Sequence, residues 1–442
     1  MRGGGEQRTE SGRVEPRYHR EIAGLALPAL GALAADPLVT MVDTLFVGRL
    51  GVVPLGALGV NASVFALAFV AFNFLAYGTT PRVAREVGRG NRTEAGRLAV
   101  EALVLAVILG VASAALLMLL AGPILRIMGA GGELFDPALA YLRIRALSGP
   151  AVLLVLAGHG IFRGYQDTRT PLYVTLALNG VNLVLDPLFI FGFGWGLQGA
   201  AWATVAAQWT GALIFLHLLL RSRRAEMGLP LALPLPRDLL PFLRIGGELA
   251  VRTVALVATM TLATAVATRV GTESVAAHQV AMQIWLFLAL VVDALAVAGQ
   301  ALVGRYRGEG GRPLARAVAH RLLAWGLAVG LALALLVHFL SPWIPGLFTG
   351  DPTTAALVGG VLPFVAALQP LNALVFVWDG IFLGAEDFRY LAFQMLVSAA
   401  AAVLILLLVL PSGWGLVGVW WGITVLMGAR GVTLALRYRR VP

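Results

Sequence analysis

The chain consists of long apolar runs that are separated by short polar breaks. About twelve of these runs reach roughly 20 residues, the length that a helix needs to cross a hydrocarbon layer about 30 Å thick. They span approximately residues 22–46, 54–80, 98–120, 139–162, 171–193 and 197–220 in the first half, and 241–268, 275–303, 317–340, 355–383, 390–410 and 416–436 in the second. The pattern predicts an all-α, polytopic membrane protein with twelve transmembrane helices.

The two halves of the chain repeat one another. The segment Gly160–Asp167 matches Gly380–Asp387 at an offset of 220 residues, and Trp195 matches Trp414 at an offset of 219. Because each half holds an even number of spans, both halves enter the membrane in the same direction, as in transporters built from parallel repeats. The sequence therefore predicts two pseudo-symmetric lobes of six helices each, with a binding site between or within the lobes near the midplane.

The polar breaks give the expected domain boundaries. A cytoplasmic N-terminal tail covers residues 1–20, the N-lobe residues 21–220, an inter-lobe linker residues 221–240, the C-lobe residues 241–437 and a C-terminal tail residues 438–442. The linker contains Pro230, Pro234 and Pro236, which is typical of a semi-rigid connection.

Arginine side chains gather in alternate loops. The loop after the second span holds five of them, whereas Arg49, Arg126 and Arg269 stand alone in the first, third and seventh loops. By the positive-inside rule, we expect both termini in the cytoplasm. The net charge of +10 does not indicate a nucleic-acid partner, because the arginines occupy short loops rather than one polar face.

Composition narrows the class of protein further. With 59% hydrophobic and 13% charged residues, the chain is too apolar for a soluble domain. It has no cysteine, which excludes disulfides and thiolate metal sites. We expect a multi-pass protein of the bacterial cytoplasmic (inner) membrane that contacts membrane lipids, works as a monomer and uses no cofactor.

Two acidic side chains interrupt the first span. Asp36 and Asp43 lie seven positions apart and therefore on roughly one face of a helix. An ionisable residue in hydrocarbon costs a few kcal/mol or more, so by default it faces a cavity and carries function. Pro28 and Pro37 mark places where this helix can bend. Asp36 has two further readings, as a cap for a helix break at Pro37 or as a hydrogen-bond partner between helices.

A polar stripe marks the fifth span, where Asn179, Asn182 and Asp186 follow one another at helical spacing. Pro187 comes next and removes a backbone donor, which leaves a carbonyl in the preceding turn free to join a cation site. Carboxylate, amide and carbonyl oxygens are the ligands of a hard cation such as Na+. They make a proton site equally well, because a carboxyl group out of water favours its neutral form.

The repeat indicates which lobe carries this chemistry. The position that corresponds to Asp43 in the second half is Ala263, and that of Asp186 is Leu406, or Ile405 at the offset of 219, so the second lobe lacks both acids. We therefore expect the ion site in the N-lobe.

Other polar residues inside the spans are candidates for an additional polar or substrate site. They are Asp36, Asn179, Gln208, His278, Gln279, Asp293, Gln300 and Asp379. Asp293 and Asp379 also fit an interhelical hydrogen-bonding role worth about 1 kcal/mol. Histidines such as His159 and His278 more commonly pack or form hydrogen bonds than bind a ligand.

Three segments resemble the signatures of a known family. Val42–Gly48 and Asn182–Phe189 resemble motifs of the multidrug and toxin extrusion (MATE) family, and Asp379–Ala385 resembles its DinF-like branch. The resemblance implies the two-lobed MATE/MOP-type fold. It also implies a secondary antiporter, rather than an enzyme, that expels small organic compounds, often cationic and amphipathic, in exchange for H+ or Na+.

The resemblance also implies roles for individual residues. The residues that match the family's cation or proton site are Asp43, Asn182, Asp186, Thr204 and Tyr141, and the first four would also hold Na+. Pro28 matches a proline at which the first helix bends. Branches with an acid well inside the seventh span use a second-lobe site, but residues 251–268 hold none. Glu248 precedes them, and Arg252 stands at i+4 to neutralise it.

One rival from another class is a lipid-linked oligosaccharide flippase, which shares the superfamily's architecture. Such flippases need a strongly basic central cavity for a pyrophosphate, and the arginines well inside the predicted spans are few. They are Arg143, Arg145, Arg252 and Arg430. An intramembrane enzyme ranks below both, because no metal-ligand motif and no nucleophile with a base is found.

Overall fold

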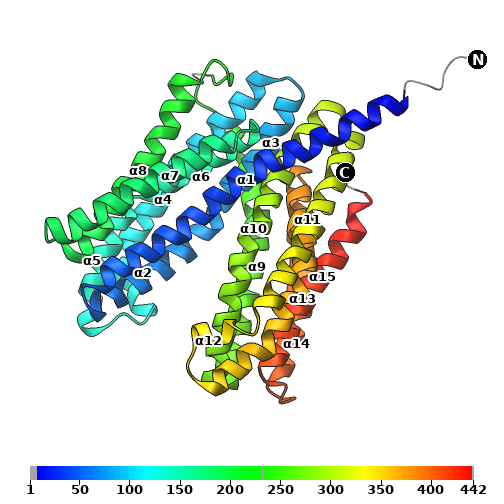
Figure 1. Ribbon diagram of the computed structural model, residues 1–442. Helices are drawn as coiled ribbons and strands as arrows, with labels where there is room; N and C mark the ends of the chain where they lie inside the picture. Colours follow the sequence, from blue (N-terminus) through cyan, green and yellow to red (C-terminus); the bar gives the residue numbers. More distant parts are fainter. Residues whose placement is uncertain (1–6, 231, 441–442) are drawn as a thin grey trace, which may run out of the picture. The chain divides into compact units, whose positions relative to one another are not determined.

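The computed structural model describes residues 7–230 and 232–440, with side chains from residue 17 onward (Figure 1). Residues 1–6 and 441–442 of the predicted tails, and Leu231 of the predicted linker, lie outside the described residues. In the described part every regular element is helical, and eleven helices are long and apolar enough to cross a membrane, or twelve if one bent pair counts as a span. The predicted all-α membrane fold is confirmed.

The chain divides into two compact units. One consists of Leu27–Gly246 and is named the N-unit; the other consists of the chain up to Ala26 and from Gly247 onward, and is named the C-unit. Two long helices, α1 (Gln7–Gly48) and α9 (Pro236–Val270), contribute residues to both. The first turns of α1 belong to the C-unit because they bind there. The Tyr306 hydroxyl donates to Glu21 at 2.6 Å, and the Trp325 indole donates to His19 at 2.7 Å.

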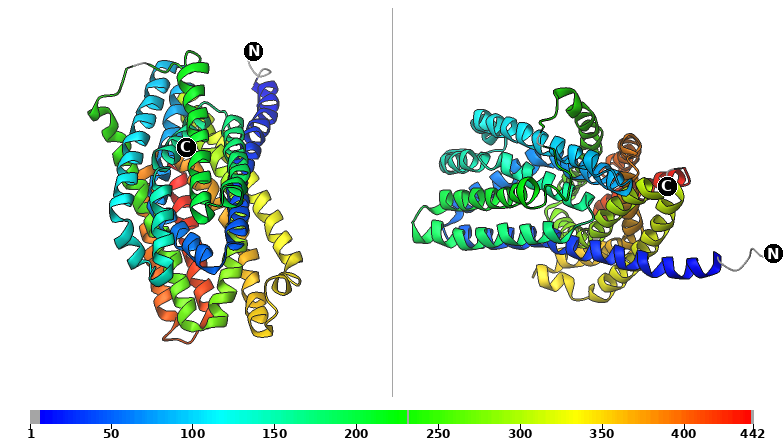
Figure 2. Two further views of the ribbon diagram at one scale, coloured as in Figure 1. Left: turned by 90° about the vertical axis from the view of Figure 1, so that its left-hand side faces the viewer. Right: turned by 90° about the horizontal axis from the view of Figure 1, so that it is seen from above.

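The N-unit is a bundle of the first-half helices (Figure 1, Figure 2). Its elements are α1 from Leu27, α2 (Val52–Val70), η1 (Ala71–Asn73), α3 (Phe74–Gly88), α4 (Arg92–Ile127), η2 (Gly132–Leu134), α5 (Phe135–Ala146), α6 (Gly149–Gly164), α7 (Arg169–Pro187), η3 (Leu188–Gly192), α8 (Gly196–His217) and η4 (Leu218–Ser222). Helix α6 packs on α3, α4 and α8, and α7 packs on α8.

The C-unit repeats this arrangement. Its elements are the last part of α9, α10 (Thr272–Gly310), α11 (Arg312–Leu340), α12 (Ile344–Phe348), α13 (Pro352–Gly384), α14 (Phe388–Val409) and α15 (Gly415–Tyr438). Helix α13 packs on α10, α11 and α15, as its counterpart α6 packs on α3, α4 and α8 in the N-unit.

The predicted fourth span is bent. Residues Gly132–Ala146 and Gly149–Gly164 meet at an angle of 49°. At the bend the Ser148 hydroxyl donates to the Arg145 carbonyl at 2.7 Å, and Pro150 has no backbone N–H to continue the ladder. The three prolines at which a bend is predicted, Pro28, Pro37 and Pro187, do not behave alike. Helix α1 runs uninterrupted through Pro28 and Pro37, whereas α7 ends at Pro187 and continues as the π-helical turn η3.

Glycine permits a close helix contact in the C-unit. A β-carbon on Gly380 of α13 would lie 2.3 Å from the Ala296 carbonyl oxygen of α10, a distance that only backbone movement can relieve. In the N-unit, the repeat counterpart Gly160 faces Ala76 in the same way, at 3.0 Å. The duplication therefore extends to the packing of the helices.

We expect Gly380→Ala to destabilise the protein by about 1–3 kcal/mol, the usual cost of overpacking a close contact. The matched control is Gly360→Ala in the same helix, where an added β-carbon meets nothing within 4 Å. Thermal unfolding of the two purified variants in detergent measures the difference. Equal melting temperatures would contradict the described α10–α13 contact.

One end of the N-unit is rich in arginine and is named the basic end. It comprises residues 88–92, 164–169 and 222–229, which are joined by bonds from Arg92 to the Glu226 carbonyl (3.2 Å) and from Arg223 to Asp167 (2.8 Å). Burial acts to raise the pKa of Asp167, but hydrogen bonds from Thr170 and Arg223 outweigh burial and hold this pKa below its ordinary value. The positive-inside rule predicts that this end faces the cytoplasm.

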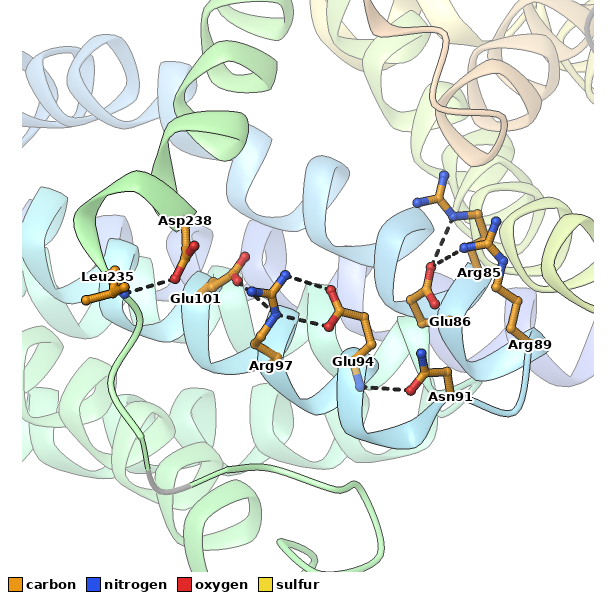
Figure 3. A network of polar contacts seen from close by, with 9 residues as sticks. All are labelled: Arg85, Glu86, Arg89, Asn91, Glu94, Arg97, Glu101, Leu235 and Asp238. Carbon is orange, nitrogen blue, oxygen red and sulfur yellow. Dashed lines mark hydrogen bonds and ion pairs between the residues drawn. The ribbon is translucent and has the colours of Figure 1, made fainter.

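Ion pairs order the turn between α3 and α4 at the basic end (Figure 3). Glu86 accepts from Arg89 at 2.8 Å, and Arg97 pairs with Glu94 at 2.8 Å. The Asn91 side chain caps α4 by accepting from the Glu94 backbone N–H at 3.2 Å, which satisfies one of the free donors at the helix start. The turn is thereby fixed at the end of the N-unit.

Candidate functional site

A cavity of about 390 Å³ lies inside the N-unit and is named the acidic cavity. Helices α1, α2, α5, α7 and α8 each contribute to its wall. Its polar lining consists of Asp36, Thr40, Asp43, Thr44, Tyr141, Arg145, Asn179, Asn182, Thr204 and Gln208. The first-half residues that the sequence indicates are therefore brought together here, with the exception of Asp186, which is buried and does not line the cavity.

The acidic face of α1 meets the polar stripe of α7 at two levels. At the first level the Asn179 amide donates to the Asp36 carboxylate at 3.0 Å. This contact shows that Asp36 bonds between helices, which was one of its alternative readings. At the second level the Asn182 amide nitrogen, turned toward Asp43, donates to both carboxylate oxygens at 3.2 Å. The two i, i+7 patterns therefore pair side by side along the two helices.

Asp186 completes the second level from one turn further along α7. Its side chain is fully buried, and its carboxyl group is close enough to the Asp43 carboxyl group for the two charges to interact. Two carboxylates repel at this distance, so a bond between them requires one of them to carry a proton. Two acids placed in this way would take up or release a positive charge together.

Thr204 and Tyr141 stand on the wall near this pair. The Thr204 hydroxyl donates to the Ala200 carbonyl at 2.9 Å, which leaves its oxygen lone pairs available to the cavity. Tyr141 of α5 is buried, with 6% of its surface exposed. Both therefore offer oxygen atoms from helices other than α1 and α7.

Arg145 is a site residue that the sequence reasoning did not assign. It lies one helical turn after Tyr141 and lines the acidic cavity, where its guanidinium stands 4.6 Å from the centre of the Phe65 ring. Its Nη1 also donates to the Ser148 hydroxyl at 2.9 Å, at the bend of the fourth span. The available signal was its i+4 spacing from Tyr141 inside an apolar span.

The charges around the acidic cavity do not balance. Three carboxyl groups, from Asp36, Asp43 and Asp186, stand in this region with the single guanidinium of Arg145. Unbalanced charge in a low-dielectric interior is costly, so the region favours a bound cation or proton. The described side chains contain no group of three or more His, Cys, Asp or Glu that would hold a metal ion. A Na+ ion at Asp43 would thus need the Thr204 hydroxyl and the Asn182 amide oxygen, and the Asn182 amide would have to turn from the orientation in which its nitrogen donates to Asp43.

The second-half candidates lie elsewhere, in the C-unit. Asp379 accepts from both Arg252 (2.6 Å) and Arg430. Neutralising Glu248, the role expected for Arg252, is therefore not its only role. His278 is fully buried, with the Thr264 hydroxyl 3.3 Å from its Nε2. The remaining three lie on α10, where Gln279 is exposed, Asp293 is half-buried and Gln300 is buried.

The chain is similar to known proteins in both of its halves. A family model described as MatE matches residues 28–188 and 249–409, once in each half. The chain is 37% identical to "Protein DETOXIFICATION 45, chloroplastic" of Arabidopsis thaliana, over 93% of this chain and 77% of that protein. It is 30% identical to "DNA damage-inducible protein F" of Escherichia coli (strain K12), over 94% of this chain and 91% of that protein.

Solved structures share the fold. The chain aligns with "Crystal structure of MATE in the bent conformation" at a TM-score of 0.88 and 24% identity, covering 96% of this chain and 95% of that one. It aligns equally well, at 0.88, with "Outward-facing conformation of a multidrug resistance MATE family transporter of the MOP superfamily", at 24% identity and 96% coverage of both chains. At this identity the likeness concerns the fold alone.

Proposed function

The chain belongs to the MATE family of transporters, and from this premise we propose that it is a secondary antiporter that exports organic, often cationic and amphipathic compounds in exchange for H+ or Na+. Family membership identifies it as a transporter and not an enzyme. The proposed ion site is in the N-unit, at Asp43, Asn182 and Asp186, with Thr204 and Tyr141 beside them.

The facing carboxyl groups of Asp43 and Asp186 carry this proposal. They bring two acids from different helices, α1 and α7, close together at the wall of the acidic cavity, where a proton or a cation can neutralise their charge. Gain or loss of that charge changes the attraction between α1 and α7, because Asn182 binds Asp43 across the same interface. Ion binding is thereby coupled to the position of α1, which also lines the cavity.

Exchange then follows from linkage. If the ion favours one arrangement of α1 and the organic substrate favours another, each lowers the affinity of the protein for the other by the same factor. The acidic wall suits a positively charged compound, and the apolar side chains Leu55, Leu58 and Phe65 on α2 suit its hydrocarbon part.

The relatives support this substrate class. The membrane in which the protein works, and its orientation there, are predictions. Those proteins carry the names "DETOXIFICATION" and "multidrug resistance protein", which agree with a substrate class of organic compounds. We propose a bacterial cytoplasmic membrane with both termini in the cytoplasm, which the arginine-rich loops and the Escherichia coli relative support, although several plant relatives carry the name "chloroplastic".

Transport in proteoliposomes tests the proposal. We expect an imposed proton or sodium gradient to drive ethidium, a cationic aromatic dye, in the opposite direction to the ion, and an ionophore for that ion to stop it. Vesicles without protein are the control. Dye movement that neither gradient changes would contradict the antiport mechanism.

The flippase alternative is distinguished in cells. Two of its candidate arginines, Arg252 and Arg430, share the carboxylate of Asp379, so their charge is partly neutralised within the C-unit. An antiporter predicts reduced drug susceptibility when the protein is expressed in an efflux-deficient host. A flippase predicts a defect in envelope polymer synthesis when the gene is removed, with drug susceptibility unchanged.

A further inference from the structure

A second cavity of about 310 Å³ lies in the N-unit next to the acidic cavity. The two share Asp36, Leu178 and Gln208 in their walls, so they adjoin at the first level of the α1–α7 contact. The second cavity extends toward the basic end, since its lining includes Arg163 in the last turn of α6, directly before residues 164–169.

Polar groups from six elements line this second cavity. Its titratable and charged groups are Asp36 of α1, Tyr77 of α3, and His159 and Arg163 of α6; Asn73 of η1, Thr175 of α7 and Gln208 of α8 add neutral polar groups. The Thr175 hydroxyl lies 3.3 Å from His159 Nε2, and Arg163 Nη2 lies 3.5 Å from His159 Nδ1. The space is large enough for several water molecules, each of which takes about 30 Å³ in the liquid.

The repeat shows what the same place looks like in the C-unit. Ala32 and His159, which line the second cavity, correspond to Arg252 and Asp379 at the offset of 220. Gly211 corresponds to Arg430 at the offset of 219. A β-carbon on Gly211 would meet Leu178 at 2.8 Å and Val155 at 3.3 Å, and both of these residues line the second cavity.

In the C-unit, therefore, charged side chains occupy the three positions that border the cavity in the N-unit. Asp379 holds Arg252 and Arg430 together, and the Arg430 guanidinium stands 5.9 Å from the Phe376 ring, whose counterpart Leu156 lines the cavity. The same fold thus holds a buried ion cluster at this place in one unit and a cavity in the other. The cavity is a feature of the N-unit and not a requirement of the helix packing.

We propose that the second cavity is the proton path between the Asp43–Asp186 pair and the basic end, and that the Asp379, Arg252 and Arg430 cluster closes the corresponding place in the C-unit. This inference rests on the proposed antiport function and narrows it to proton coupling. The Arg163 guanidinium beside His159 opposes the passage of a metal cation. A proton moves instead by exchange along Asp36, water and the His159 and Thr175 groups, and no net bond is made or lost in the chain.

The absence of cysteine makes a direct test possible, because any single introduced cysteine is the only thiol in the protein. The matched variants are Val155→Cys, in the wall of the second cavity, and Val375→Cys, its repeat counterpart, which is fully buried in the C-unit. A small membrane-impermeant methanethiosulfonate is applied to either face of membrane vesicles. We expect Val155→Cys to react from the face that carries the basic end, and at least about tenfold faster than Val375→Cys, because thiol reactivity requires solvent access.

Filling the cavity after folding tests its function. In proteoliposomes, we expect a bulky methanethiosulfonate on Val155→Cys to slow dye-coupled proton movement by at least about tenfold, and the same treatment to leave Val375→Cys unchanged. A thiol at residue 155 that is no more reactive than the one at residue 375, or that reacts only from the opposite face, overturns the proposal. So does normal coupled transport after modification. If unmodified Val155→Cys and the parent protein both fail to exchange protons for dye, the antiport function itself fails, whatever the labelling shows.

Discussion

Replacing Asp186 by asparagine is expected to abolish ion-coupled export while leaving the protein inserted and folded. Asparagine has the size of aspartate, and the residue is fully buried beside Asp43, so the packing of α7 is retained. Asparagine at position 186 cannot take up or release a charge, and its amide can donate to Asp43 at all pH values. The change in dye affinity with ion concentration, typically about 5–150-fold for coupled sites, should therefore disappear.

The measurement is dye binding and transport at a series of pH values and sodium concentrations. Asp136→Asn is the matched control, since Asp136 is an exposed acid of the same unit, in the first turn of α5. We expect that control to transport as the parent protein does. Ion-dependent dye binding that persists in Asp186→Asn would remove this residue from the coupling site and leave Asp43 with Asp36 as the remaining acids of the cavity.

The helical pattern predicted the central contact of the site, because spacing along a helix determines which side chains share a face. The i, i+7 spacing of Asp36 and Asp43 and the Asn179, Asn182, Asp186 stripe both follow from 3.6 residues per turn. A polar stripe in an apolar bundle must face another polar group or a cavity, and here the two stripes face one another. The twelve apolar runs similarly match the spans of the described residues, which number twelve when the bent fourth one is counted.

Contacts that join helices far apart in sequence were not predicted, because no local pattern specifies which partner a side chain meets. Arg252 has an acid at i−4, Glu248, yet it binds Asp379, which is 127 residues away. Arg145 was considered only as a basic residue inside a span, although it lines the acidic cavity. The second cavity depends on the side chains that are missing at Ala32 and Gly211, and it becomes visible only when the two repeats are compared as packed structures.

Loss of the Asp379 charge is expected to have the largest effect on stability. Asp379 is paired with two arginines, Arg430 with 1% and Arg252 with 12% of its side chain exposed. In Asp379→Asn both guanidinium groups stay buried and lose their counter-charge. Removal of one partner from a buried ion cluster typically costs about 3–5 kcal/mol.

Asp387→Asn provides the matched comparison for this change. Asp387 also pairs with an arginine of α15, Arg437, but both side chains are partly exposed, at 20% and 36%. An exposed pair of this kind contributes about 0–1 kcal/mol. We therefore expect unfolding of purified protein in detergent, by heat and by SDS titration, to give a much larger loss for Asp379→Asn than for Asp387→Asn.

A triple variant separates charge from packing in the cluster. Arg252→Met, Asp379→Leu and Arg430→Met together keep the volume that fills this place in the C-unit and remove all three charges. Because a buried ion cluster and an apolar cluster of similar volume are often about equal in stability, we expect the triple variant to be more stable than Asp379→Asn alone. Equal losses in Asp379→Asn and Asp387→Asn, or a triple variant less stable than the single one, would show that Asp379 does not hold two buried cations. The contrast between a closed C-unit and a hollow N-unit would then lose its physical basis.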